Sequence, residues 1–224
     1  MFKPLNRNQM AWRAAQDLEE GTVVNLGMGM PVLAASYAPL GREIIFQSEN
    51  GIIGAGPEAS ENERDPDLVD ASSRFVTLAP GAALIESAAS FAMIRGGHID
   101  VTMLGGFEVA SNGDLANWDM QVPNKGQLVG GAMDLAFGAG EVRVIMQHQT
   151  KDGSPRLLNA CRLPLTAPRC VTRIYTDLAV VDVKENGFLV REMLQGMTQE
   201  DLQSRTEAPL AFARDLASLT PPDL

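Results

Sequence analysis

The sequence predicts an α/β fold in which a mostly parallel sheet is flanked by helices. Segments with helical periodicity alternate with short, almost continuously apolar runs, a pattern typical of strands buried on both faces of a parallel sheet. The chain has 224 residues, enough to bury roughly 70% of its unfolded surface. Its 45% hydrophobic and 21% charged residues exclude a disordered or fibrous chain. We therefore expect one domain spanning residues 1–224.

The first half is expected to begin with a helix. Asn6 or Asn8 can cap it, apolar positions at helical spacing run from Met10 to Leu18, and Gly21 suits the left-handed position that follows. The acidic segment 58–70 is expected to be an exposed loop. The other expected elements are a strand at 22–26, a glycine turn at 27–30, a helix from Pro31, a strand at 43–47, a helix at 86–95 and a strand at 99–104.

The second half is expected to be richer in strands. Apolar, β-branched runs predict strands at 142–146 and 178–183, and a turn at 184–187 predicts a hairpin to 188–190. Helices are expected at 132–137 and after Thr198, which begins a capping-box pattern. The Pro-rich end is expected to fray, from about residue 208 at the earliest.

Charge and composition exclude several functions. Lys plus Arg number 18 and Asp plus Glu number 28, so the net charge is −10, which disfavours nonspecific binding to nucleic acid or anionic lipid. No apolar run approaches the roughly 20 residues that span a bilayer, and we expect a cytoplasmic protein without membrane association. Cys161 and Cys170 stand far from any metal-ligand spacing, so two buried free thiols and no metal site are expected.

Common cofactor and nucleophile motifs are incomplete. Gly27 and Gly29 occupy a strand-to-helix turn, but the third position of a dinucleotide fingerprint is Val32, and no phosphate-binding Gly-Lys-Ser/Thr follows. No serine lies in a Gly-x-Ser-x-Gly turn. His98 opens a strand and is expected to be structural. We expect no cofactor.

The segment 46–57, Phe-Gln-Ser-Glu-Asn-Gly-Ile-Ile-Gly-Ala-Gly-Pro, places a carboxylate in an unusual position. Glu49 leaves a strand and enters a turn with three glycines within seven residues. At the carboxyl end of a parallel strand such a group faces the ligand crevice, and glycines let backbone N–H groups approach it. A loop carboxylate that caps a neighbouring turn is an equally good interpretation from the residues alone.

This segment resembles the active-site signature of the family I CoA-transferases, specifically the beta subunit of the 3-oxoacid enzymes. The resemblance extends from about Asn8 to Glu207 and includes, in the same order, the segments 90–98, 113–118, 130–135 and 163–166. It implies the CoA-transferase fold, which is similar to that of some isomerases. It also implies transfer of CoA from succinyl-CoA to a 3-oxo acid such as acetoacetate or 3-oxoadipate, by ping-pong kinetics through a glutamyl-CoA thioester, with CoA as a substrate.

The resemblance also assigns site residues. Glu49 would be the nucleophile, and Gly130 matches the position that supplies an oxyanion-hole N–H. Asn25 matches a position that can hydrogen-bond the glutamate or an acyl carboxylate. Asn50 and Gly51 are placed with the substrate-binding residues.

One position departs from the family pattern. Many members carry Lys where this chain has Ser73, and a cation there is expected near the substrate carboxylate or CoA. Arg74 is adjacent, but successive side chains of a strand point to opposite faces. Substrate preference is therefore left open.

The chain alone lacks a basic cradle for the phosphates of CoA, and the resemblance implies a separate alpha subunit, with two copies of each chain in a heterotetramer. Two alternatives stay open from the sequence. One is a sugar-phosphate isomerase or deaminase of similar fold. The other is a noncatalytic subunit that kept the scaffold.

Overall fold

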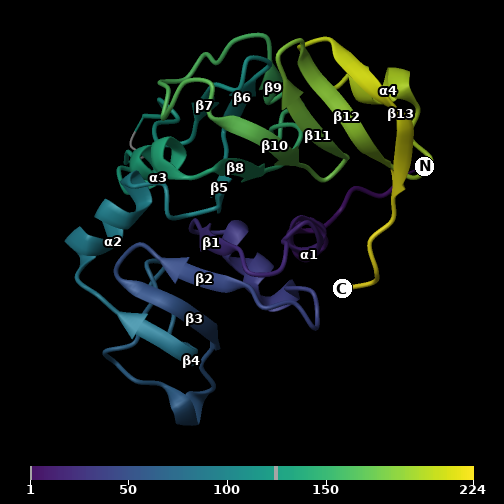
Figure 1. The fold of residues 1–224 in the computed structure, drawn as a ribbon. Coiled ribbons are helices and arrows are strands. Elements are labelled where there is room, and N and C mark those ends of the chain that lie inside the picture. Colours follow the sequence, from purple (N-terminus) through teal and green to yellow (C-terminus); the bar gives the residue numbers. More distant parts are fainter. Residues whose placement is uncertain (1, 124–125) are drawn as a thin grey trace.

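The computed structural model describes residues 2–123 and 126–224 and is built around one large sheet (Figure 1). The strands of this sheet lie in the spatial order β13 (Leu210–Leu219), β12 (Gly187–Leu194), β11 (Ala179–Lys184), β10 (Val171–Tyr175), β8 (Glu141–Ile145), β5 (Val101–Gly105), β1 (Val23–Leu26), β2 (Ile45–Ser48), β3 (Ile52–Glu58) and β4 (Val76–Leu84).

The centre of the sheet is parallel, as predicted. Strands β2, β1, β5, β8 and β10 run side by side in one direction. Antiparallel strands extend the sheet on both sides, with β3 and β4 beyond β2, and β11 and β12 beyond β10. The hairpin expected between 178–183 and 188–190 is the β11–β12 pair. Carboxyl ends of the central strands therefore meet along one edge of the sheet.

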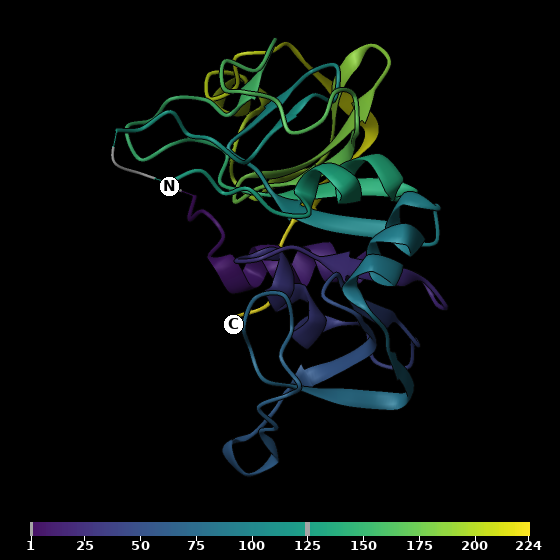
Figure 2. The same cartoon turned by 90° about the vertical axis from the view of Figure 1, so that its left-hand side faces the viewer.

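Helices cover the sheet in two groups. α1 (Arg7–Gln16) packs on the 3-10 helix η1 (Pro31–Tyr37), and α2 (Ser87–Arg95) packs on α3 (Ala132–Gly138), as Figure 2 shows. The remaining short elements are η2 (Glu61–Glu63), α4 (Gln199–Gln203) and a small sheet of β7 (Leu115–Ala116), β6 (Glu108–Ala110) and β9 (Leu157–Leu158). No helix of the described residues is long and apolar enough to cross a bilayer.

The first helix forms for the reasons that its sequence indicates. The Asn6 side chain accepts the Gln9 N–H at 2.9 Å, and the Gln9 side chain accepts the Asn6 N–H at 3.0 Å, which satisfies two free donors of the first turn. Met10 and Ala14 are fully buried on its inner face. The helix expected from Pro31 is present, although it is of the 3-10 type.

The prediction of a frayed end from about residue 208 is wrong. Residues 210–219 form β13, which pairs with β12 in parallel, so partner-strand hydrogen bonds satisfy its backbone. Leu210 and Phe212 pack against the core. The tail beyond it runs beside α1 (Figure 1), where the Leu224 carbonyl accepts a hydrogen bond from Asn6 at 3.2 Å.

Candidate functional site

A cavity of about 490 Å³ opens at the carboxyl edge of the parallel strands. Gly27 follows β1, Glu49 follows β2, Gly106 follows β5 and Gln147 follows β8, and all four line it. In open α/β sheets this edge is where ligands bind. Its other lining residues are mostly apolar or glycine, and include Met28, Met30, Leu104, Gly105, Phe107, Asn117, Met120, Leu128, Gly130, Gly131, Leu135 and Arg156.

Glu49 reaches the cavity because a tight turn follows β2. The Gly51 N–H donates to the Ser48 carbonyl at 2.9 Å, and Gly51 adopts a φ of 124° that favours glycine. A Cβ atom at Gly51 would lie 2.0 Å from the Ile85 carbonyl oxygen. Glycine is therefore required at this position to close the turn that holds Glu49.

The Glu49 carboxylate lies against the loop that precedes α3. Its Oε1 atom is 2.9 Å from the position that a Cβ of Gly131 would occupy, and two ring atoms of Phe91 are 3.0 Å from that same position. Burial raises the pKa of Glu49, and the Asn25 side chain partly offsets this rise. A partly desolvated carboxylate of raised basicity is suited to nucleophilic attack.

A buried polar network supports the turn from below. The Asn25 amide donates to the Gln47 side-chain oxygen at 2.6 Å, and the Gln47 amide donates to the Ser90 hydroxyl at 2.7 Å. The Thr102 hydroxyl lies 3.4 Å from the Asn25 side-chain oxygen. All four residues are buried, so the network ties β1, β2, α2 and β5 together under Glu49.

Gly130 lines the same cavity as Glu49. A Cβ atom at Gly130 would meet no atom of residues 2–123 or 126–224 within 4 Å, so the absence of a side chain leaves open space in the cavity rather than avoiding a clash. Gly130 also lacks a positive φ among the described backbone angles. Backbone conformation therefore does not require glycine here.

The remaining predicted site residues lie outside the cavity lining. Asn25 is buried in the network beneath it. Asn50 is exposed, and its amide donates to the Val69 carbonyl at 2.7 Å. Gly51 shapes the turn. The structure thus brings Glu49 and Gly130 together around the cavity and places the other three beside or below it.

The structure also places Ser73, the position at which the family resemblance led us to expect lysine. Ser73 is exposed in a turn, with φ of 61°, and lies outside the Glu49 cavity. Arg74 belongs to the same turn and not to a strand, because β4 begins at Val76. Its guanidinium donates to the Asp70 carboxylate at 2.9 and 2.7 Å, so this cation is already paired.

Sequence reasoning missed three residues of the site. Gly131 and Gln47 belong to segments that resemble the family, but only the fold shows that Gly131 contacts Glu49 and that Gln47 links Asn25 to Ser90. Arg156 stands in no motif, and no local signal could have found it, because the pairing of distant segments brings it to the cavity. His98, expected to be structural, is exposed at the end of α2 and away from the cavity lining.

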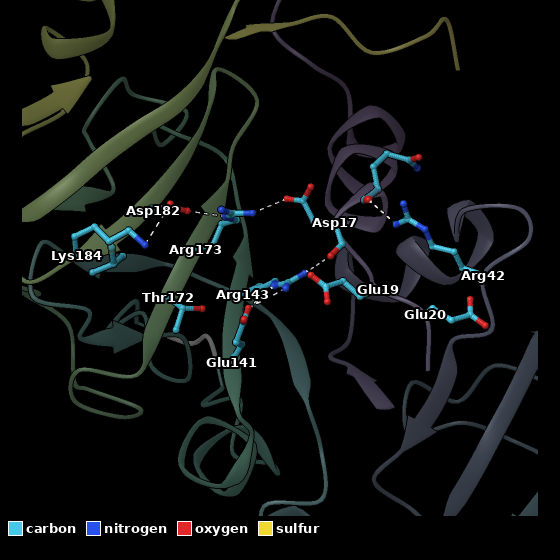
Figure 3. Close-up of a pocket in the computed structure, with 12 residues that line it drawn as sticks. Asp17, Glu19, Glu20, Arg42, Glu141, Arg143, Thr172, Arg173, Asp182 and Lys184 are labelled. Carbon is cyan, nitrogen blue, oxygen red and sulfur yellow. Dashed lines mark hydrogen bonds and ion pairs between the residues drawn. The ribbon is translucent and has the colours of Figure 1, made fainter. Parts of the chain in front are cut away.

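A larger hollow, of about 920 Å³, lies at the opposite edge of the sheet (Figure 3). Most of its cations are matched by carboxylates: Arg173 bridges Asp17 at 2.8 Å and Asp182 at 2.6 Å, and Arg143 pairs with Glu141 at 2.8 Å, while Arg42 donates to the Leu18 carbonyl at 2.6 Å. Because these charges satisfy one another, we interpret the hollow as a structural ion-pair network beneath α1.

The two cysteines are free and partly buried. Burial raises the pKa of each thiol to about 12, so neither is a ready nucleophile.

Comparison with solved structures identifies the fold. An acyl-CoA transferase of Escherichia coli O157:H7, YdiF, matches with a TM-score of 0.74 at 20% identity over 97% of this chain, which spans 44% of that longer chain. Glutaconate coenzyme A-transferase of Acidaminococcus fermentans matches with a TM-score of 0.66 at 17% identity, covering 100% of this chain and 92% of that one.

Comparison of sequences identifies the family. The chain is 45% identical to one subunit of the 3-oxoadipate CoA-transferase of Acinetobacter baylyi, over 95% of this chain and 98% of the relative. It is 46% identical to one subunit of the succinyl-CoA:3-ketoacid coenzyme A transferase of Helicobacter pylori, over 90% and 97%. The beta subunit of the acetate CoA-transferase of Escherichia coli is 43% identical over 94% and 95%. The family model for coenzyme A transferase matches residues 7–204, so this chain, with its carboxylate poised at the crevice of the sheet, belongs to the coenzyme A transferase family.

Proposed function

We propose that this chain is the catalytic subunit of an enzyme that transfers CoA from succinyl-CoA to a 3-oxo acid, with Glu49 as the covalent carrier. One observation carries the proposal: the Glu49 carboxylate lies in a cavity at the carboxyl edge of the parallel strands, against the Gly130–Gly131 loop. The names of the relatives support the substrates, since they include succinyl-CoA:3-ketoacid and 3-oxoadipate CoA-transferases.

The reaction proceeds by two exchanges at Glu49. Its carboxylate attacks the thioester carbonyl, the C–S bond breaks, and an acyl-glutamyl anhydride and CoA thiolate form. The thiolate then attacks the glutamyl carbonyl, which releases succinate and leaves a glutamyl-CoA thioester. The acceptor carboxylate reverses both steps, so that its own acyl group leaves as the new thioester. Succinate must leave before the acceptor reacts with the glutamyl-CoA thioester, and this order gives ping-pong kinetics.

Every step passes through a tetrahedral oxyanion, and backbone N–H groups near Glu49 are suited to stabilise it. Gly130 is the candidate donor because no side chain stands between its backbone and the open cavity. The Asn25–Gln47–Ser90 network fixes the turn below, so that Glu49 stays in position for attack. Asn50 and Gly51 contribute by holding that turn.

A partner subunit completes the enzyme. Around the cavity mouth, Met28, Leu128 and Val129 are 64%, 58% and 75% exposed, an apolar rim that suits burial against another protein. Relatives of the same length are named as one subunit of a CoA-transferase. We propose an alpha subunit in a heterotetramer, working in the cytoplasm without metal or nicotinamide.

The other two candidate functions are less well supported. An isomerase or deaminase acts by proton transfer and has no use for a covalent carboxylate. A noncatalytic subunit would not need Glu49 in the cavity. Identities of 43–47% to CoA-transferase subunits over most of the chain favour the transferase.

The test is a transfer assay of this chain reconstituted with its candidate alpha subunit, using succinyl-CoA and acetoacetate. Glu49→Gln keeps the size but removes the anionic oxygen, and transfer is expected to be abolished. Glu49→Asp withdraws the carboxylate by one methylene and is expected to be severely impaired. Glu185→Gln, at an exposed turn, is the matched control. Substantial transfer by Glu49→Gln, or full turnover without the partner, would contradict the proposal.

Kinetics give a second test of the same proposal. Parallel initial-rate plots are expected when donor and acceptor are varied together, and exhaustive chelation is expected to leave the rate unchanged. Intersecting plots would indicate that both substrates react in one complex, without the covalent intermediate.

A further inference from the structure

Arg156 is a cation of the Glu49 cavity that no described carboxylate neutralises directly. Its backbone is fixed on both sides, since its N–H donates to the His148 carbonyl at 3.1 Å and its carbonyl accepts the Val109 N–H at 3.0 Å. Its side chain lines the cavity. The fold therefore fixes the backbone from which this side chain extends to the cavity.

The guanidinium is poorly satisfied. One Nη atom reaches the Gly106 carbonyl only at 3.5 Å, and the buried Nε atom has no hydrogen-bond partner among the described residues. A buried donor without a partner is costly to the folded state. The guanidinium therefore has N–H groups that can donate hydrogen bonds to an oxygen of a bound ligand.

Nearby carboxylates are committed to other groups. Asp177 and Glu108 both favour the charged form of Arg156 from a distance, while burial lowers its pKa. One Asp177 oxygen accepts the His148 N–H at 2.7 Å, and one Glu108 oxygen accepts the N–H groups of Arg162 and Leu163 at 2.7 and 2.9 Å. The Arg156 guanidinium, a group that stays protonated in proteins, forms no ion pair with a carboxylate of the described residues.

The cavity that Arg156 and Glu49 both line suits an aliphatic chain with charged ends. Apolar side chains such as Met30, Leu104 and Leu135 line it. Its volume of about 490 Å³ is within the range of small-molecule sites. The other lining cation, Arg7, is exposed at the start of α1, where water screens its charge.

We propose that Arg156 binds the distal carboxylate of a dicarboxylic acyl group whose other end reacts at Glu49. This inference rests on the proposed function and deepens it, because it assigns substrate selectivity to one residue. A planar guanidinium binds a carboxylate through two parallel hydrogen bonds, and an acyl group without a distal carboxylate would leave the cation unpaired. Ser73, the position expected to matter from the family pattern, lies outside the cavity.

The test compares succinyl-CoA with butyryl-CoA, which has the same number of carbons but no distal carboxylate, in the reconstituted enzyme. Arg156→Met removes the charge and keeps an apolar stem. It is expected to lower kcat/KM for succinyl-CoA by about 10- to 100-fold and for butyryl-CoA by less than about 3-fold. Arg156→Lys keeps the charge but not the two-pronged geometry, and is expected to lie between wild type and Arg156→Met for succinyl-CoA.

Arg205→Met is the matched control. Arg205 also has a buried Nε without a described partner, but it lies over the Phe2 ring and away from the cavity lining. It is expected to leave the ratio between the two donors unchanged. Equal losses with both donors in Arg156→Met would mean that Arg156 serves the CoA moiety or the fold, and no loss would mean that it has no role. Either result overturns the inference.

A binding measurement separates this inference from the proposed function. Ligand-observed NMR is expected to show succinate binding to the wild-type complex and to Glu49→Gln, and weaker binding to Arg156→Met, with butyrate unaffected. Succinate binding that persists in Arg156→Met overturns the role of Arg156 even if transfer occurs. Transfer that persists in Glu49→Gln overturns the proposed function even if the binding pattern holds.

Discussion

Gly131→Ala tests how closely the α3 loop positions Glu49. Gly131 has φ −72° and ψ −2°, which alanine adopts without strain, so the substitution acts only through its methyl group. That methyl group would stand 2.9 Å from the Glu49 Oε1 and 3.0 Å from the Phe91 ring. Ordinary contacts begin near 3.4 Å, so the carboxylate must retreat by about 0.5 Å or more. Since a misplacement of about 1 Å costs on the order of 100-fold in rate, we expect kcat to fall about 10- to 100-fold.

The assay is single-turnover formation of the glutamyl-CoA adduct together with steady-state transfer, alongside a thermal melt. Gly126→Ala is the control, because a Cβ at Gly126 meets no atom within 4 Å in the part of the chain that the structure describes, and Gly126 is outside the cavity lining. Gly131→Ala is expected to have a melting temperature close to that of wild type but lower rates of adduct formation and of transfer. A wild-type rate in Gly131→Ala, or an equal loss in Gly126→Ala, would refute this reasoning.

Further predictions concern stability and reactivity. Glu49→Gln is expected to melt above wild type at pH 7, because the pKa of Glu49 is raised in the folded protein and its ionisation therefore opposes folding. This effect vanishes below the ordinary pKa of 4.5, so the gain in melting temperature over Glu185→Gln should shrink as the pH falls towards 4.5. A melting temperature below that of wild type at pH 7 would contradict this. Gln47→Leu is expected to destabilise the protein by about 2–4 kcal/mol in urea unfolding, because it removes one side-chain hydrogen bond from each of two buried partners, Asn25 and Ser90, and a change below about 0.5 kcal/mol would show the network to be dispensable. Cys161 and Cys170 are expected to resist iodoacetamide at pH 8, where a pKa of about 12 leaves only about one thiol in 10⁴ ionised, and complete labelling of the folded protein within minutes would contradict their burial.

Local patterns predicted much of the fold. The capping residues of α1 and α4, the central strands β1, β2, β5 and β8, and the β11–β12 hairpin follow from signals within a few residues of each element, whereas the central strand β10 was not predicted. The last strand, β13, was not predicted, because the charged residues Arg214 and Asp215 interrupt its apolar pattern and prolines follow it. Its stability comes from pairing with β12, which no local pattern reports.

The site divides in the same way. The position of Glu49 at the carboxyl edge of the sheet was predictable, since a carboxylate between a strand and a glycine turn is a local feature, whereas its role as nucleophile was implied only by the family resemblance. Arg156 was not, because its position depends on contacts with His148 and Val109 from other parts of the chain. The family resemblance predicted a role in substrate binding for the position of Ser73, yet Ser73 does not line the cavity.

The central claim is that Glu49 carries CoA covalently. The most direct measurement is a peptide mass spectrum of the reconstituted enzyme after incubation with succinyl-CoA and reduction with borohydride. A glutamyl thioester is reduced to a primary alcohol, whereas a free carboxylate is not. The account predicts this alcohol at Glu49 and its absence in enzyme that has not met an acyl-CoA. An unmodified Glu49 in enzyme that is turning over, or the alcohol at another residue, would contradict it.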